Sequence, residues 1–500
     1  MINLKTEAFV LPVRIKPELL EVFEHPIIFY LTHHSDKRRI LPTFVILDCK
    51  KQELQYTVSY LPENIKKIED HEDQEILNGS LQHNPHCSLK INNEHFLTIV
   101  DQARYFYHVD RARNEMILYT ANDLASSTGK NIYNICSTAY KDADDADFFY
   151  FSAATLRGPA DEKELLFYRA RLDLSEFELL YTEQRAEGRA PHVTKKIGNC
   201  LLNSKFVVAN LTNNKTGQVF TGEGPYIRFM YKSLYRSFCA LHDKIFKEPL
   251  PGDEHAFLTT ILHDEDFIVY MQSKGRNLFE ICANDEDYSF SVDKGEITLL
   301  NLDTKKLEVY RTANCMPAHF EIDDETNTVY ISSHNFIMLP KHGYLGPAAI
   351  EEFSFTGEKL ERKGVFSHPD GYRFTTHRFF KYKGKRYLCT FGQPNRLFFV
   401  DADTMEMLYH DDIEEDLLSG QSNINDFLNY TNTESFAIRA IEISSDGQYL
   451  FLLSHHFIYF YSFPERKIVQ KIRYTSDIPL GENLNLKDFR KLTSHVNYLI

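Results

Sequence analysis

A hairpin phrase that recurs seven times constrains the fold of this 500-residue chain more than any other feature. Each copy is an apolar strand, a short polar turn and a second apolar strand. The copies begin at Phe44, Arg104, Leu166, Ile297, Ile350, Leu397 and Ile458. In most units a further pair of strand-like runs precedes the hairpin. The repetition predicts four antiparallel strands per unit and a radial arrangement of the units.

A closed ring of such four-stranded sheets is a β-propeller, in which the first strand of every blade lines a central channel. The clearest unit runs from Thr376 to Asp412, and the last contains an Asp446-Gly447 turn that suits a tight hairpin. We predict an all-β fold with one seven-bladed propeller over residues 1–500. In rhythm the repeat resembles WD-repeat and YVTN-type propellers, although the chain has no Trp and therefore no Trp-Asp signature.

One interval, between His192 and Ile297, is longer than a blade needs. Residues 226–246 have the apolar spacing of a helix, and prolines follow them. We expect a helical insertion over residues 212–256 that acts as a lid on the channel; a degenerate eighth blade is the alternative. Residues 479–500 are expected to close the ring or to form a C-terminal tail.

Composition excludes some partners. The formal charge of −15 argues against nucleic acids and anionic membranes, because both select basic surfaces. No apolar run is long enough to span a membrane, and the N-terminal residues do not resemble a signal peptide. The eight cysteines are scattered without a CxxC motif, which indicates reduced thiols. We therefore expect a cytoplasmic protein.

The sharpest chemical signal is a column of histidines among the 21 in the chain. When the units are aligned, the first strand of four of them opens with a histidine at the same place, and three of these follow a proline closely. The four are His86, His192, His319 and His377, and the last blade holds Arg439 in this column. First strands line the channel, so the column places these side chains on one ring at one depth.

Four neutral imidazoles that converge on a point suit iron, copper or zinc. We predict that the four histidines bind a metal and that Arg439 is a catalytic residue. Carboxylates that orient the imidazoles would complete the site, and Glu321 and Glu442 on first strands are the candidates. The alternative is structural: a histidine at a strand entry often only hydrogen-bonds a neighbouring turn.

The plan resembles that of carotenoid-cleaving oxygenases, which are seven-bladed propellers whose iron(II) is held by four histidines of inner strands under helical insertions. Selenium-binding-protein-like thiol oxidases are similar in the same general way. The resemblance implies Fe(II), or else copper or zinc, and an oxidation of a small apolar or aromatic substrate.

Two other classes of function remain open. A non-catalytic propeller could present one face to a protein partner, which the acidic surface and long polar connections suit. Metal-free lyase, lactonase or cyclase chemistry could use histidine and arginine side chains in the channel.

Overall fold

The computed structural model describes most of the chain. The described residues are 1–33, 43–60, 62, 85–92, 94–100, 105–136, 138–142, 144–155, 164–184, 189–207, 210–213, 219–221, 288–291, 294–314, 316–334, 336–338, 342–344, 347–369, 371, 374, 376–392, 396–413, 438–454, 457–474, 489–492 and 497–498.

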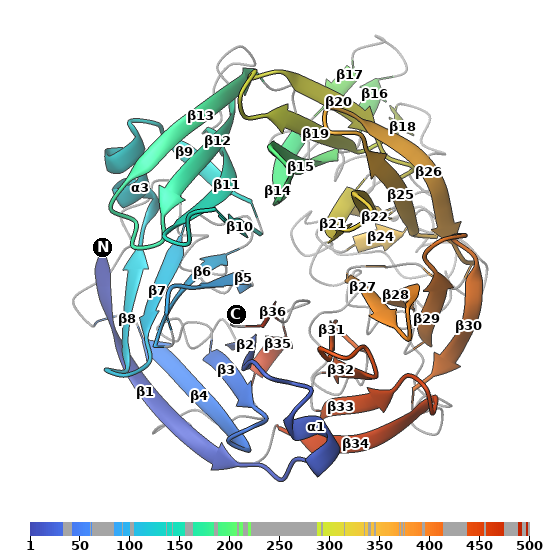
Figure 1. The fold of residues 1–500 in the computed structure, drawn as a ribbon. Coiled ribbons are helices and arrows are strands. Elements are labelled where there is room, and N and C mark those ends of the chain that lie inside the picture. The colour runs from blue at the N-terminus through green and yellow to red at the C-terminus, as the bar shows by residue number, and fades with distance from the viewer. Residues whose placement is uncertain are drawn as a thin grey trace, which may run out of the picture.

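The described residues form a ring of antiparallel sheets around a central channel (Figure 1). In the second and third blades, successive strands of the chain run from the inner strand outward. The second blade contains β5 (Pro85–Lys90), β6 (His95–Val100), β7 (Phe106–Asp110) and β8 (Glu115–Tyr119). The third contains β9 (Ile132–Ile135) and β10 (Tyr140–Lys141) at the inner position, then β11 (Phe148–Thr155), β12 (Glu164–Arg171) and β13 (Phe177–Gln184). Helix α3 (Ala121–Thr128) connects these two blades.

Four more blades repeat the pattern. The fourth contains β14 (Arg189–Ile197), β15 (Cys200–Val207), β19 (Glu296–Asn301) and β20 (Leu307–Arg311). The fifth contains β21 (Met316–Asp323), β22 (Thr328–His334), β25 (Ala349–Phe355) and β26 (Leu360–Ser367). The sixth contains β27 (His377–Tyr382), β28 (Lys385–Gly392), β29 (Arg396–Asp401) and β30 (Met407–Asp412). The seventh contains β31 (Ala440–Ile443), β32 (Tyr449–Leu453), β33 (Phe457–Ser462) and β34 (Lys467–Arg473).

The first blade combines both ends of the chain. Its inner position holds β35 (Phe489–Leu492) and β36 (Asn497–Tyr498), which pair with β2 (Ile27–His33). Outward from β2 follow β3 (Thr43–Asp48), β4 (Glu53–Tyr60) and β1 (Ile2–Pro12). Strand β1 also pairs with β8, so it joins the first two blades at the rim. The N-terminal and C-terminal strands thus belong to the same blade.

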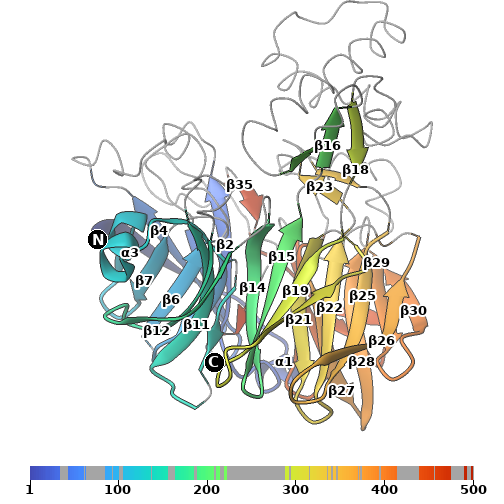
Figure 2. The same cartoon turned by 90° about the horizontal axis from the view of Figure 1, so that it is seen from above.

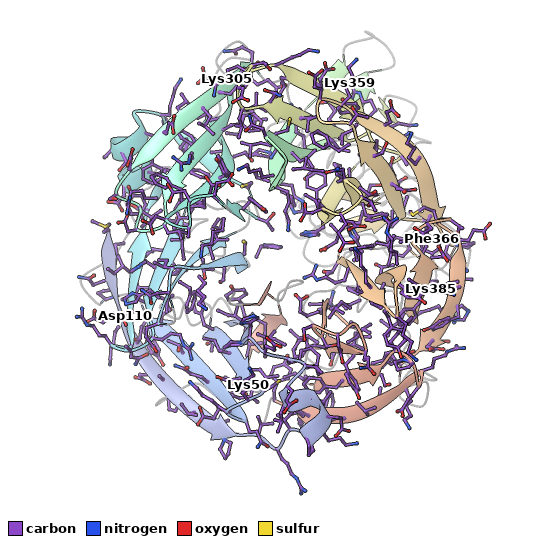
Figure 3. The ribbon with its side chains drawn as sticks, in the orientation of Figure 1. Lys50, Asp110, Lys305, Lys359, Phe366 and Lys385 are labelled. Atoms are coloured by element: carbon purple, nitrogen blue, oxygen red, sulfur yellow. The ribbon has the colours of Figure 1, made fainter. Side chains whose placement is uncertain are left out.

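The same geometry recurs in the outer hairpin turns of five blades and explains why the sequence repeats. In five blades the residue that ends the third strand accepts a hydrogen bond from the backbone N–H three residues later: Asp48, Asp110, Asn301, Asp401 and Ser462. The residue after that donor is left-handed in each case: Gln52, Asn114, Lys305, Met405 and Arg466. A short polar side chain thus accepts a hydrogen bond from a backbone N–H of the turn. The labelled turn residues Lys305 and Lys359 lie toward the outside of the ring (Figure 3).

The core lies between neighbouring blades. Among the described residues, seven apolar clusters each combine side chains from two adjacent sheets. The cluster between the seventh and first blades includes a T-shaped contact of Phe29 with Tyr474, whose ring centroids are 5.2 Å apart. The Tyr56 hydroxyl also donates to the Tyr474 carbonyl at 2.8 Å. These contacts join the end of the last blade to the first.

The segment around helix α1 (Pro17–Leu20) reinforces this junction. The amide of Lys16 donates to Gln470 Oε1 at 2.9 Å, and the amide of Ser445 donates to the carbonyl of Val22 at 3.0 Å. Both partners belong to the seventh blade. The ring is therefore closed by backbone pairing in the first blade and by packing across its junction with the seventh.

The long interval of the sequence is a connection within the fourth blade. Strand β15 pairs directly with β19, so residues 208–295 leave and re-enter the same sheet. Here β16 (Asn210–Asn213), β17 (Val219–Thr221) and β18 (Tyr288–Ser291) form a small sheet. It lies on the same side of the ring as β23 (Phe336–Met338), which pairs with β24 (His342–Tyr344) (Figure 2).

The sequence predictions for this interval have no test. The helix expected over 226–246 lies outside the described residues, as does nearly all of the lid expected over 212–256 and of the eighth-blade alternative.

The all-β propeller predicted from the sequence is confirmed, and all seven predicted hairpins are paired strands. The described residues form seven blades of four or more strands, a count that covers only this part of the chain. The five described cysteines are buried, and none of them forms a disulfide. Among the described helices, none has the length and apolar character required to cross a membrane.

We expect the C-terminal strands to stabilise the whole ring. Deletion of residues 489–500 removes the strands that pair with β2 and should lower the free energy of unfolding by about 2–4 kcal/mol, since a few main-chain hydrogen bonds of roughly 1 kcal/mol each are lost. Denaturant unfolding measures this. A deletion of residues 499–500 alone is the control, and equal stability of the two deletions would show that the pairing contributes nothing.

Candidate metal centre in the channel

The sequence column of histidines is built by a recurring irregularity at the start of inner strands. The pairing register shifts between Pro85 and Cys87 in β5, between Pro191 and Thr194 in β14, and between Pro317 and His319 in β21. A β-bulge changes the direction of a side chain, and proline is tolerated there because it has no N–H to pair. The motif of proline followed by histidine is therefore a strand entry with a bulge.

Serine hydroxyls of the second strand support two of these bulges. The Val193 N–H donates to Ser204 Oγ at 3.1 Å, and the His319 N–H donates to Ser332 Oγ at 3.3 Å. Both serines are fully buried. The backbone groups that the bulge removes from the ladder thus find a partner, which holds the adjacent histidines in place.

Three of the predicted histidines come together in the channel. The ring centroids of His86 and His192 are 6.4 Å apart, and those of His192 and His319 are 5.6 Å apart. The three rings come from the second, fourth and fifth blades, and each residue is buried. We call His86, His192 and His319 the histidine cluster.

Burial keeps at least one of these imidazoles neutral. Desolvation lowers the pKa of His319 well below its usual value, and the charges of His192, His86, His377 and Arg378 act in the same direction. A neutral imidazole has a free nitrogen lone pair at physiological pH, which is the form that binds a metal ion. His319 is therefore a donor in the protonation state that a metal centre requires.

His377 is oriented differently. It is fully buried at the start of β27, and its Nε2 lies 3.2 Å from the carbonyl oxygen of Tyr330 in the fifth blade. Burial lowers the pKa of His377 to about 4. The Nε2–H donates to this carbonyl, so Nδ1 carries the lone pair, and within the described part of the chain it has no hydrogen-bond partner. His377 contributes to the field at His319, but it does not line the channel cavity.

A charged network lies beside the cluster. Arg378 donates from Nε and Nη2 to the two oxygens of Glu442, at 3.2 Å each, and from Nη1 to Glu321 at 3.0 Å. The two carboxylates raise the pKa of Arg378 against the effect of burial, while burial raises the pKa of Glu442 against the effect of Arg378. Arg378 therefore holds two inner-strand carboxylates from the fifth and seventh blades.

This network corrects one sequence prediction. Glu321 and Glu442 were expected to orient the metal-binding imidazoles, but the hydrogen bonds of these carboxylates go to Arg378 instead. Arg378 itself was missed. Side chains alternate between the two faces of a strand, so Arg378 points to the face opposite that of its neighbour His377. This alternation was the sequence signal that could have identified Arg378.

Two members of the cluster, His86 and His319, line a cavity of about 570 Å³, whereas His192 is not among its lining residues. Its lining runs from the start of the inner strands to the turn between β31 and β32, at the end of the blades opposite the 208–295 connection. The lining residues are His86, Cys87, Thr138, Ala139, Lys195, His319, Phe320, Glu321, Arg378, Phe379, Phe380, Lys381, Glu442, Ile443, Ser444, Ser445 and Gly447. Three phenylalanines and several charged groups share the wall.

The donor set matches a metal ion in chemistry and in spacing. Bonds of about 2.0–2.1 Å from metal to nitrogen place the centroids of two imidazoles on one ion roughly 4.5–6.5 Å apart. The measured separations of 5.6 and 6.4 Å lie in that range. Within the described residues, no three His, Cys, Asp or Glu side chains already converge on one point. Metal binding therefore requires rotation of the imidazoles within the cluster.

Arg439 lies apart from this arrangement. It is buried immediately before β31, and its backbone N–H donates to the Leu453 carbonyl at 2.7 Å. It is absent from the cavity lining given above, so its catalytic role stays a prediction. Among the described residues, Arg378 is the arginine in contact with the cavity.

We expect Arg378 to be essential to the stability of the channel. Arg378→Met leaves two buried carboxylates without their counter-charge and should lower the free energy of unfolding by about 3–5 kcal/mol. The double substitution with Glu442→Gln should recover part of this loss, because one of the buried charges is removed. Denaturant unfolding compares them, and an Arg378→Met protein as stable as the wild type would contradict the assignment.

Comparisons with known proteins find only distant structural similarity. No protein-family model and no curated protein sequence matches the chain. One similar solved structure is dihydro-heme d1 dehydrogenase NirN in complex with DHE, with 10% identity and a TM-score of 0.41 over 98% of this chain and 77% of that one. Another is oligogalacturonate lyase in complex with manganese, with 10% identity and a TM-score of 0.40 over 91% of this chain and 95% of that one. The resemblance to carotenoid-cleaving oxygenases stays a prediction, and the β-propeller rests on the strand pairing of this chain itself.

Proposed function

We propose that this protein is a metal-dependent enzyme whose centre lies in the propeller channel, with His86, His192 and His319 as ligands of a divalent transition metal. The observation that carries the proposal is the proximity of three buried imidazoles from three blades, two of which line one cavity. A structural role would need only one histidine at each strand entry and would not bring their rings together.

Iron(II) is the ion we expect first, and copper or zinc would fit the same nitrogen donors. When bound, iron or copper would supply activation of dioxygen, and zinc would supply a Lewis acid. Oxidation of a small molecule is thus the specific form of the proposal. His377 would join as a fourth ligand only if its ring turned away from the Tyr330 carbonyl.

The chain's own residues would position the substrate. The cavity is open to the end of the blades where Ser444 and Ser445 lie, and the cluster lies at its inner end. Phe320, Phe379 and Phe380 would pack against an apolar part of the substrate. Arg378 pairs with Glu321 and Glu442 and holds both carboxyl groups in place, which gives the wall a fixed arrangement of polar groups.

Metal-free acid–base chemistry is the second candidate, and one observation favours it. Glu442 and Lys195 line the same cavity as His319, so proton donors and acceptors are available without a metal. Metal analysis separates the two candidates. A protein partner on one face of the propeller remains a further prediction that the same metal analysis addresses only indirectly.

We expect the protein purified without chelator or affinity nickel to contain a transition metal near one equivalent by elemental analysis. His192→Ala and His319→Ala should each lower metal affinity by about 100-fold or more, because each removes one of three ligands. His377→Ala should have a much smaller effect.

The matched control is His108→Ala, a histidine on β7 whose ring contacts His95 rather than the cluster. Thermal unfolding of every variant checks that folding is intact. Full metal content in folded His192→Ala and His319→Ala proteins, or no metal after anaerobic reconstitution of the wild type with iron or copper, would contradict the proposal.

A further inference from the structure

The charges of the channel cavity are unequally compensated. Of the cations in its lining, Arg378 is paired with two glutamates. Lys381 forms ion pairs with Asp323 at 3.3 Å and Glu325 at 2.6 Å. Lys195 is different: within the described part of the chain no carboxylate forms an ion pair with it. Although the chain has a net charge of −15, this ammonium group has no carboxylate counter-ion among the residues that the structure describes.

Strand β14 directs this lysine into the cavity. Thr194 points between the blades, where its hydroxyl lies 2.8 Å from that of Ser152. The next residue, Lys195, lines the cavity, and Lys196 points away again to Asp142 and Asp144. The alternation of a β-strand therefore places the Lys195 ammonium on the same side as the cluster, three residues beyond His192.

The charge of Lys195 acts on groups around the cluster. Burial raises the pKa of the Cys87 thiol to about 11, and the Lys195 charge opposes that rise. The same charge contributes to the lowered pKa of His377. Cys87 belongs to the second blade and His377 to the sixth, so the ammonium lies within electrostatic reach of both sides of the channel.

A hydroxyl group lies next to this lysine. Thr138 occupies the third blade at the level of the histidine column, and its backbone is hydrogen-bonded to Thr194 at 3.0 Å. Thr138 lines the cavity, and its Oγ1 is buried with no hydrogen-bond partner among the described residues. A buried hydroxyl without a partner is costly, so a ligand that accepts its hydrogen bond would be stabilising.

We propose that Lys195 and Thr138 form an anion subsite of the channel that binds a carboxylate of the substrate beside the histidine cluster. The ammonium supplies the charge and the Thr138 hydroxyl donates a hydrogen bond. Together with the phenylalanines of the wall, the subsite defines the substrate class as a small molecule with an apolar part and a carboxylate. That the bound carboxylate belongs to a substrate rests on the proposed function. The anion subsite itself needs no metal.

The test uses the full-length protein freed of metal by chelation and dialysis, and calorimetric titration with succinate. Wild type should bind succinate at millimolar concentration and bind succinamide, its neutral analogue, at least about tenfold more weakly. Lys195→Met should weaken succinate binding by about tenfold or more, and Lys195→Arg should retain it within about threefold. Thr138→Val should weaken it by a smaller factor. Inorganic phosphate, titrated in parallel, separates a carboxylate subsite from a phosphate subsite.

Lys196→Met is the matched control, because this neighbouring lysine points away from the cavity, and its succinate affinity should equal that of the wild type. If Lys195→Met fails to fold, reductive methylation of the wild type followed by peptide mass spectrometry replaces it: succinate should protect Lys195 and leave Lys196 unprotected.

The proposal is overturned if the wild type binds neither succinate nor phosphate at 50 mM (roughly the limit for a useful weak site), if phosphate binds at least tenfold more tightly than succinate, or if Lys195→Met binds succinate as the wild type does. Because these titrations use metal-free protein, their failure is distinct from a failure of the histidine variants to lose metal.

Discussion

Closure of the ring is the constraint on which the rest of the structure depends. The candidate site takes side chains from the second to the seventh blades, and no two of its inner strands form a ladder with each other apart from the short bridge at Thr138. Their spacing is set by the apolar clusters between blades. The first blade completes the circle because strands from both ends of the chain pair within it. A loosened junction would therefore widen the channel everywhere and separate the imidazoles.

The channel contains buried polar groups, each of which would be costly to bury without a partner. The bulges at the strand entries turn histidines inward, and the serines behind them satisfy the displaced N–H groups. Arg378 pairs directly with the buried Glu442 and the partly buried Glu321. Loss of Arg378 alone would be costly, but replacement of such a network as a whole by apolar side chains would cost little stability, which is why we assign the network to function.

The sequence predicted what is encoded locally. The hairpins were visible because their turns depend on one short polar residue, such as Asp48 or Asn301, and on alternating apolar strands. The histidine column was visible because a proline marks the bulge. The residues that pair with β1 and with β35 were not predictable, since these partners lie far away in the chain. Closure of the ring was one of two expectations for residues 479–500, but the strand β2 that accepts them was not predicted. Lys195 and Thr138 were missed because their importance depends on which side of an inner strand faces the channel, and on a neighbouring blade that lacks a histidine.

The origin of the innermost strands of the first blade has a consequence for synthesis of the protein. Strand β2 leaves the ribosome early, yet its partners lie at residues 489–498. At about 5–20 residues per second, the backbone groups along that side of β2 stay unpaired for roughly the whole time of translation. An unpaired strand edge is a template for another chain. On a polysome, the tail of one finished copy can insert into the incomplete first blade of its neighbour, so exchanged dimers are the characteristic misassembly of this architecture.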